Sequence, residues 1–190
     1  MDQEEHSPKE EYANWKAPDA VTERADEKQK RWDEITAEIE TIGDGRGHGI
    51  DEGIKKPIIG LMSFDFPTSQ SCEGHLDQSG TPFPWVQIMA DEPEQYDHPP
   101  ETNPKWIALN QIQRDKMVLL LEEFYTNRNT TPDAKIIMDD IGNYGTFRLQ
   151  SQGGSEIEDL PKSGLVDKYS LYVSEMEDFG AFLKEKFFKS

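Results

Sequence analysis

The spacing of apolar residues predicts a chain in which helices alternate with pairs of short strands. Helical spacing of three and four covers residues 19–43, about 51–66, 103–127 and 174–190. Short segments with strand character lie at 68–72, 85–90, 134–138 and 146–150. The resulting order is helix, helix, strand, strand, helix, strand, strand, helix. This order favours an α+β fold in which helices pack on a small mixed or antiparallel sheet.

The first 43 residues are expected to divide into an arm and a helical extension. Residues 1–18 are polar and without periodicity, which predicts a disordered or loosely docked acidic arm. Residues 19–43 form an amphipathic helix whose apolar stripe needs a partner surface. That surface is either the chain's own domain or a second subunit, and the second case would give a homo-oligomer. Residues 44–190 are expected to form a single α+β domain.

Several helix boundaries follow from local signals. Asp51 is expected to cap the second helix, and Pro57 predicts a kink or a late start there. Asn103 followed by Pro104 predicts the start of the third helix. Ser174 and Glu177 form a capping box that predicts the start of the last helix, after a polar connection. The third helix is expected to place its apolar residues in the core, namely Trp106, Leu109, Ile112, Val118, Leu119, Leu120 and Phe124.

The glycine-rich run 43–49 invites comparison with phosphate-binding loops. Such a loop follows a buried strand and opens a helix, with glycines at fixed spacings. Here the run follows a helix, and its glycines stand at every second position. We therefore interpret it as a flexible linker.

Charge narrows the classes of partner. The chain has 190 residues with 20 Lys plus Arg against 38 Asp plus Glu, which gives a net charge of −18. Such a surface repels phosphate backbones, so nucleic acid is not expected as a partner. One cysteine excludes an intrachain disulfide, and no apolar run of about 20 residues predicts a membrane span. The acidic N-terminus does not resemble a signal peptide, so the expected location is the cytoplasm.

The segment Ser71–His75 concentrates the candidate chemistry, because it supplies a hydroxyl, a thiol, a carboxylate and an imidazole. In strand geometry Glu73 and His75 share a face, which makes them a candidate catalytic acid–base pair. Alternatively, Cys72 and His75 bind a divalent metal such as zinc. A third interpretation is a buried cysteine beside a structural turn. Further metal ligands would come from His48, His98 or Asp77.

Two residues outside this segment complete the candidate ligand-binding set. Arg148 lies in a predicted strand and can pair with a bound carboxylate or phosphate, or with Glu73. Trp85 can form a pocket wall, with ordinary loop packing as the alternative. Together with Ser71 and Cys72 they are the residues expected to contact a ligand. A pocket of this kind predicts that Glu73, His75 and Arg148 converge on one cavity.

The stretch from Gly49 to Ala90 carries a resemblance to known proteins. It contains Gly-Ile-Asp-Glu-Gly-Ile-Lys at 49–55, Ser-Cys-Glu-Gly-His at 71–75 and Pro-Trp-Val at 84–86. It resembles a group of uncharacterised bacterial proteins that share the Ser-Cys-Glu-Gly-His signature. It is also similar to Tyw3-type wybutosine-synthesis methyltransferases, which carry Ser-Cys-Ser-Gly-Arg and modify tRNA with S-adenosylmethionine. Because Glu73 and His75 replace the serine and arginine, this second resemblance implies a shared fold and not a shared activity.

Three functional hypotheses follow. The first is a pocket around Ser71–His75 that binds a small-molecule ligand or a protein partner. The second is an enzyme that uses Glu73 and His75, either a hydrolase or a transferase, including a metal-dependent or a tRNA- or nucleotide-modifying one. The third is an interaction protein that acts through its acidic N-terminal helix.

Overall fold

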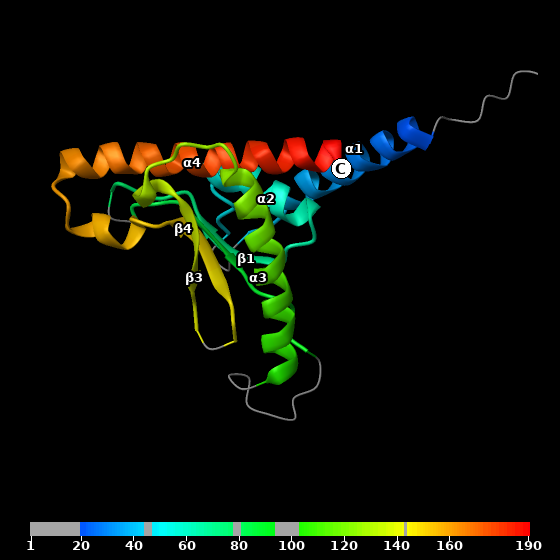
Figure 1. Cartoon of the computed structure of the whole chain (residues 1–190), viewed down its shortest axis with the longest axis horizontal. Coiled ribbons are helices and arrows are strands. Elements are labelled where there is room, and N and C mark those ends of the chain that lie inside the picture. Colours follow the sequence, from blue (N-terminus) through cyan, green and yellow to red (C-terminus); the bar gives the residue numbers. More distant parts are fainter. Residues whose placement is uncertain (1–19, 44–46, 78–80, 94–102, 143) are drawn as a thin grey trace, which may run out of the picture.

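The computed structural model describes residues 20–43, 47–77, 81–93, 103–142 and 144–190 (Figure 1). The arm predicted at 1–18 and the middle of the glycine-rich run lie outside these residues. At the ends of that run, Gly43 and Gly49 form an isolated antiparallel bridge. The elements in order are α1 Ala20–Ile39, η1 Glu52–Ile54, α2 Lys55–Ser63, β1 Thr68–Cys72, β2 Trp85–Ile88, α3 Pro104–Tyr125, η3 Pro132–Ala134, β3 Ile136–Asp140, β4 Phe147–Ser151, η4 Gly154–Asp159 and α4 Lys162–Lys189.

The four strands form one antiparallel sheet in the order β1-β2-β4-β3. The chain therefore has the predicted α+β fold, and the sheet is the antiparallel form of the two that the pattern allowed. Strands β3 and β4, which are consecutive along the chain, form an antiparallel hairpin. Both β1 and β3 are edge strands, so β1, which leads into the Ser71–His75 segment, has one long side free of other described strands.

One face of the sheet holds the main core. Val86 lies opposite Leu149, and Ile88 lies opposite Phe147. All four are fully buried, and they pack with apolar residues of the helices, including Phe179 of α4. The opposite face is largely polar, because residues alternate along each strand. It carries Gln70, Gln87, Arg148 and Asp139 in one cross-strand row and Cys72, Trp85, Gln150 and Ile137 in the next.

Helix α1 packs on its own chain through the second half of its length. Trp32, Ile35 and Ile39 are buried in the main core. The Trp32 ring lies 6.0 Å from that of Phe187 near the end of α4. In Figure 1 the two helices lie side by side at that end of the molecule. The stripe thus has its partner surface within the same domain.

Local signals predicted the late start of α2 and the start of α3 correctly, whereas the cap expected from Asp51 is not formed. The α-helix begins at Lys55, just before Pro57, which is the late start that proline favours. The Asn103 side chain accepts hydrogen bonds from the backbone N–H groups of Lys105 and Trp106 at the start of α3.

Two predictions about the helices were wrong. Helix α4 begins at Lys162 and not at Ser174, because Leu165, Tyr172 and Met176 continue its apolar face through the segment expected to be a polar connection. The second error concerns α3, where Trp106, Leu120 and Phe124 are buried as expected. The other four predicted core residues of α3 are exposed, namely Leu109, Ile112, Val118 and Leu119.

Among the described residues, no helix is long and apolar enough to cross a membrane.

Helices α2 and α4 approach each other closely because glycines stand at their crossing. A Cβ atom added at Gly180 would lie 2.9 Å from the backbone nitrogen of Pro57. One added at Gly60 would lie 2.7 Å from Cβ of Leu183. This contact holds the start of α2 against the rest of the domain. Asp51, which lies just before η1 and α2, is held in place with it.

Replacement by alanine should affect stability in opposite directions at two glycines of α4, one at the crossing and one away from it. Gly180→Ala should destabilise the protein by about 1–2 kcal/mol, because the overlap with Pro57 outweighs the gain in helix propensity. Gly164→Ala is the control, since its added Cβ meets nothing closer than 4.0 Å. That change should be neutral or stabilising by up to about 1 kcal/mol. Urea unfolding measures both, and equal effects would contradict the close crossing.

Candidate functional site

The candidate site forms where the chain leaves β1 and turns at Gly74. Gly74 is buried and has φ of +88°, a conformation that L-residues rarely adopt. A Cβ atom there would lie 2.8 Å from the carbonyl carbon of Phe83, so the turn also requires the absence of a side chain. Beyond the turn, the His75 backbone N–H donates to the Thr81 carbonyl at 2.8 Å. The chain therefore folds back, which brings His75 beside Cys72.

Asp51 approaches the same place from the helical layer. Its side chain makes no capping hydrogen bond to the helix that follows, contrary to the expected cap. One carboxylate oxygen, Oδ2, instead accepts a hydrogen bond from the backbone N–H of Glu73 at 3.2 Å. The same oxygen lies 3.6 Å from Nε2 of His75.

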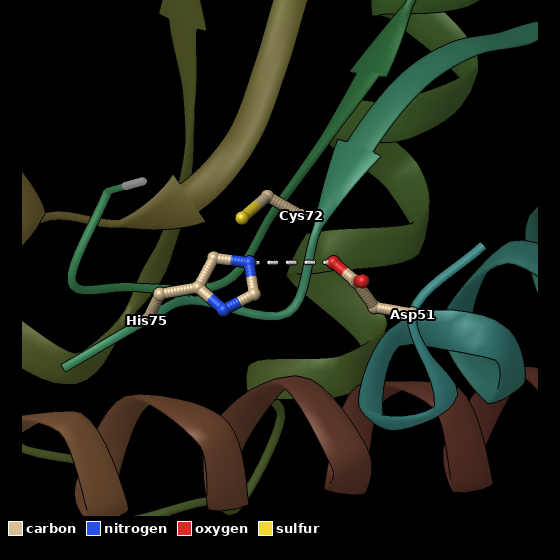
Figure 2. A group of neighbouring side chains, drawn as sticks. All are labelled: Asp51, Cys72 and His75. Carbon is tan, nitrogen blue, oxygen red and sulfur yellow. Dashed lines mark ion pairs between the residues drawn. The ribbon is translucent and has the colours of Figure 1, made fainter. Parts of the chain in front are cut away.

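Asp51, Cys72 and His75 thus form a compact group, which we call the triad. One oxygen, one sulfur and one nitrogen from the three side chains all lie within 4.8 Å of one another. Figure 2 shows the three side chains pointing toward a common centre from the loop before η1, the end of β1 and the turn. Cys72 is part-buried, and the side chains of His75 and Asp51 are 29% and 36% exposed. The group is therefore within reach of a ligand.

The orientation of the imidazole ring distinguishes two chemistries for the triad. In a charge-relay arrangement, one ring nitrogen faces the nucleophile and the other faces the carboxylate. In Figure 2, Nε2 faces Asp51, the thiol of Cys72 lies toward this same edge of the ring, and Nδ1 points to the opposite side. Three donor atoms that converge on one point fit a shared cation better than a relay.

The distance between Asp51 and His75 supports the same interpretation. At 3.6 Å, Oδ2 and Nε2 are too far apart for a direct hydrogen bond. Two ligands that each lie about 2.0–2.1 Å from a tetrahedral zinc ion are about 3.3 Å apart. The observed separation is close to that value, so a small shift of either side chain would complete the pair of ligands.

Backbone groups of the Ser71–His75 segment orient two of the triad side chains. The N–H of Gly74 points at Cys72 Sγ at 3.4 Å, and the N–H of Glu73 contacts Asp51. Amide groups directed at a sulfur and a carboxylate fix the orientation of these side chains. The short segment therefore supplies two of the side chains and the hydrogen bonds that position them.

Tyr169 of α4 is a neighbour of the triad that the sequence did not indicate. A Cβ atom at Gly74 would lie 3.0 Å from its ring. Burial raises the pKa of its hydroxyl, and the negative charges of Glu73, Cys72 and Asp51 raise this pKa further. The hydroxyl therefore stays protonated at neutral pH and can donate a hydrogen bond.

A cavity of about 620 Å³ opens along the free side of β1 and reaches the triad. This volume is in the range of small-molecule sites. All three triad residues line it, together with Ser71 and Trp85. The far wall comes from the segment around the glycine-rich run, namely Ile42, Gly43, His48, Gly49 and Ile50.

The structure brings together four of the six predicted site residues. Ser71, Cys72, His75 and Trp85 line the cavity, whereas Glu73 and Arg148 are not among its lining residues. Glu73 accepts a hydrogen bond from the backbone N–H of Gly53 at 2.8 Å, so it does not form the expected pair with His75. The expected convergence of Glu73, His75 and Arg148 on one cavity is therefore not observed.

Arg148 lies next to the cavity instead of in it. Its guanidinium group stacks on the Trp85 ring at 3.9 Å from the ring centroid. Its Nε donates to Gln87 at 3.4 Å. No carboxylate among the described residues forms an ion pair with Arg148. Apart from the hydrogen bond to Gln87, the N–H groups of the guanidinium therefore remain available to an anionic group.

The three residues that the sequence offered as further metal ligands lie in different places. His48 lines the same cavity, Asp77 is exposed outside the triad, and His98 lies outside the described residues. The third side chain of the triad is Asp51, which we expected to cap a helix. The only signal that could have identified it is its place before a helix in the same resembling stretch as Ser71–His75.

A second cavity, of about 490 Å³, lies between α3 and the β3–β4 hairpin. Its main charged groups satisfy each other, because Arg114 pairs with Asp140 and donates to the carbonyl of Gly145. The first cavity is therefore the stronger candidate for a functional site.

No protein-family model matches the chain, and no curated protein or solved structure is significantly similar to it. The two resemblances given above remain predictions. Function is accordingly inferred from the side chains of the cavity.

The turn that positions His75 gives a testable prediction. Gly74→Ala should lower the free energy of unfolding by about 3 kcal/mol, through its positive φ and its overlap with Phe83. Gly142→Ala is the control, because Gly142 also has a positive φ, of +65°, but its added Cβ meets nothing closer than 3.7 Å. It should cost only about 1 kcal/mol. Similar losses in chemical denaturation would show that the contact with Phe83 is unimportant.

Proposed function

We propose that Asp51, Cys72 and His75 bind one divalent metal ion, with zinc as the preferred metal, and that the protein uses this ion to hold a small-molecule ligand in the cavity beside β1. The observation that carries the proposal is the convergence of a thiol, an imidazole and a carboxylate within 4.8 Å. The expected pocket around Ser71–His75 is thereby retained, with Asp51 in place of Glu73.

The ligand set favours zinc over other biological cations. Thiolate and imidazole ligands suit zinc, whereas magnesium and calcium prefer oxygen ligands. A structural zinc site has four protein ligands, whereas a catalytic one has three and leaves the fourth position for water or substrate. The triad supplies three, and all three side chains line the cavity. The arrangement is therefore of the open type.

The surroundings of the cavity indicate a ligand with an anionic group. Arg148 stacks on Trp85, whose ring lines the cavity, and it has no carboxylate partner among the described residues. In a chain with a net charge of −18, such a guanidinium is an unusual local source of positive charge. A carboxylate or phosphate group would pair with it while another part of the ligand reaches the metal.

Hydrolysis is the second candidate function, and the open coordination position favours it. A bound zinc ion supplies a water molecule with a lowered pKa or polarises a carbonyl or phosphoryl oxygen. The protonated hydroxyl of Tyr169 lies beside the triad, where it can donate a hydrogen bond to a developing negative charge. Because thiols are kept reduced in the cytosol, a thiol ligand supports the proposal of a cytoplasmic location.

Metal content tests the proposal directly. The full chain, stripped of metal and then dialysed against zinc, should retain one ion per molecule. Asp51→Asn, Cys72→Ser and His75→Gln should each weaken zinc binding by more than about 100-fold, because each removes a ligand and not merely its support. Mass spectrometry of bound metal and a competing chelator measure stoichiometry and affinity.

Glu73→Gln is the matched control for Asp51→Asn. Glu73 is adjacent to the triad in sequence, but its side chain accepts from Gly53, and glutamine can keep this hydrogen bond. It should bind zinc like the unaltered protein. Cobalt substitution adds an independent readout, since a thiolate ligand gives a charge-transfer band that Cys72→Ser should remove. Absence of stoichiometric metal, or equal loss in Glu73→Gln, would refute the site.

A further inference from the structure

Helix α3 carries more exposed large apolar side chains than any other described element. Five of the nine large apolar side chains exposed among the described residues belong to it. Leu109, Ile112 and Leu119 are 42%, 54% and 66% exposed, although a surface helix usually confines its apolar residues to the face that packs on the core. These three residues therefore need an explanation that packing within the domain does not provide.

Leu109, Ile112 and Leu119 belong to one regular stripe along the helix. Steps of four and three residues alternate along it, which is the spacing of a coiled-coil seam. The buried residues Trp106, Met117 and Phe124 occupy a neighbouring face, so Leu109, Ile112 and Leu119 stay exposed while α3 packs on its own domain. The members of this stripe, here called the α3 seam, are Lys105, Leu109, Ile112, Lys116, Leu119 and Glu123.

The α3 seam is complementary to itself when two copies are antiparallel. If the two-fold axis crosses α3 at the level of Arg114, two residues at equal distances before and after Arg114 in the sequence face each other across the dimer. Leu109 then meets Leu119 of the second copy, five residues to either side. Lys105 meets Glu123, nine residues to either side, so opposite charges face each other at both ends of the seam. Glu123 also pairs with Lys186 of its own chain, so its carboxylate would be shared between the two cations.

The central position is compatible with this pairing. Ile112 faces Lys116 of the second copy, two residues to either side of Arg114. The Lys116 ammonium group donates to the carbonyl of Phe64 at 3.3 Å and lies 4.7 Å from the centroid of the Phe66 ring. The charge is therefore held by its own chain, and the aliphatic stem is left to contact Ile112.

We infer that α3 is a homodimerisation surface, in which two copies of the chain pair their α3 helices antiparallel along this seam. The occupant is a second copy because antiparallel pairing sets Lys105 opposite Glu123 at both ends of the seam, whereas parallel pairing in register would set like charges opposite each other. The seam does not include the triad, and dimerisation is independent of the proposed metal. Two chains of net charge −18 repel each other, so association is favoured at physiological ionic strength, where charges further apart than about 8 Å are screened.

Sedimentation velocity of the full chain at micromolar concentrations tests this inference. The unaltered protein should be a dimer, and so should Asp51→Asn, which removes a proposed metal ligand. Leu119→Glu should weaken dimerisation by more than about 100-fold, because the symmetry places two unpaired carboxylates in the apolar seam. Val118→Glu is the matched control, since Val118 is also exposed on α3 but lies outside the seam. A monomeric unaltered protein, or a dimer insensitive to Leu119→Glu, would overturn the inference.

Charge exchange tests the antiparallel register. Lys105→Glu and Glu123→Lys should each weaken the dimer roughly tenfold, because each places like charges opposite one another twice. Mixing the two single variants should restore association, since the mixed dimer regains both opposite-charge pairs. Lys105 and Glu123 of one chain are about 27 Å apart along α3, so rescue cannot arise within a single chain. Failure of the mixture to recover would overturn the register and with it the proposed seam.

Discussion

The burial of one face of the sheet against the helical layer is the constraint on which the other features depend. Val86, Ile88, Phe147 and Leu149 are fully buried on that face and contact α4 through residues such as Phe179. Apolar burial of this extent is the dominant favourable term in folding. In this sheet β1 is an edge strand. The close crossing of α2 and α4 holds the loop before α2 near the end of β1. Asp51 comes from this loop, and Cys72 and His75 come from the end of β1 and the turn that follows it.

The site itself is built mainly by backbone conformation. Gly74 allows the turn against Phe83, and the turn brings His75 to the same side as Cys72. The amide groups of the segment then orient the thiol and Asp51. The short signature therefore combines two donor side chains with the geometry that directs them, which explains why its glycine matters as much as its reactive residues. The same arrangement leaves Glu73 to hold Gly53 and removes it from the cavity.

Much of the fold was predictable from the sequence because its signals are local. The strand Thr68–Cys72 and the Asn103 cap depend on residues close in the chain. The start of α4 was missed because its first turns pack through Leu165 and Tyr172, and the sparse apolar pattern there indicates a helix only once that partner surface is known. Asp51 was missed for a related reason: contact between residues 51 and 75 is set by tertiary structure. The exposed residues of α3 carried a helical pattern that cannot distinguish a core from a surface shared with another chain.

The most direct test of the central claim is X-ray absorption spectroscopy at the zinc edge of the zinc-loaded protein. A zinc ion bound by the triad should have one sulfur ligand at about 2.3 Å and lighter ligands at about 2.0–2.1 Å, from His75, Asp51 and a water or substrate atom. Replacement of Cys72 by serine should remove the sulfur contribution. A shell without sulfur, or one with several sulfurs, would contradict a metal held by Asp51, Cys72 and His75.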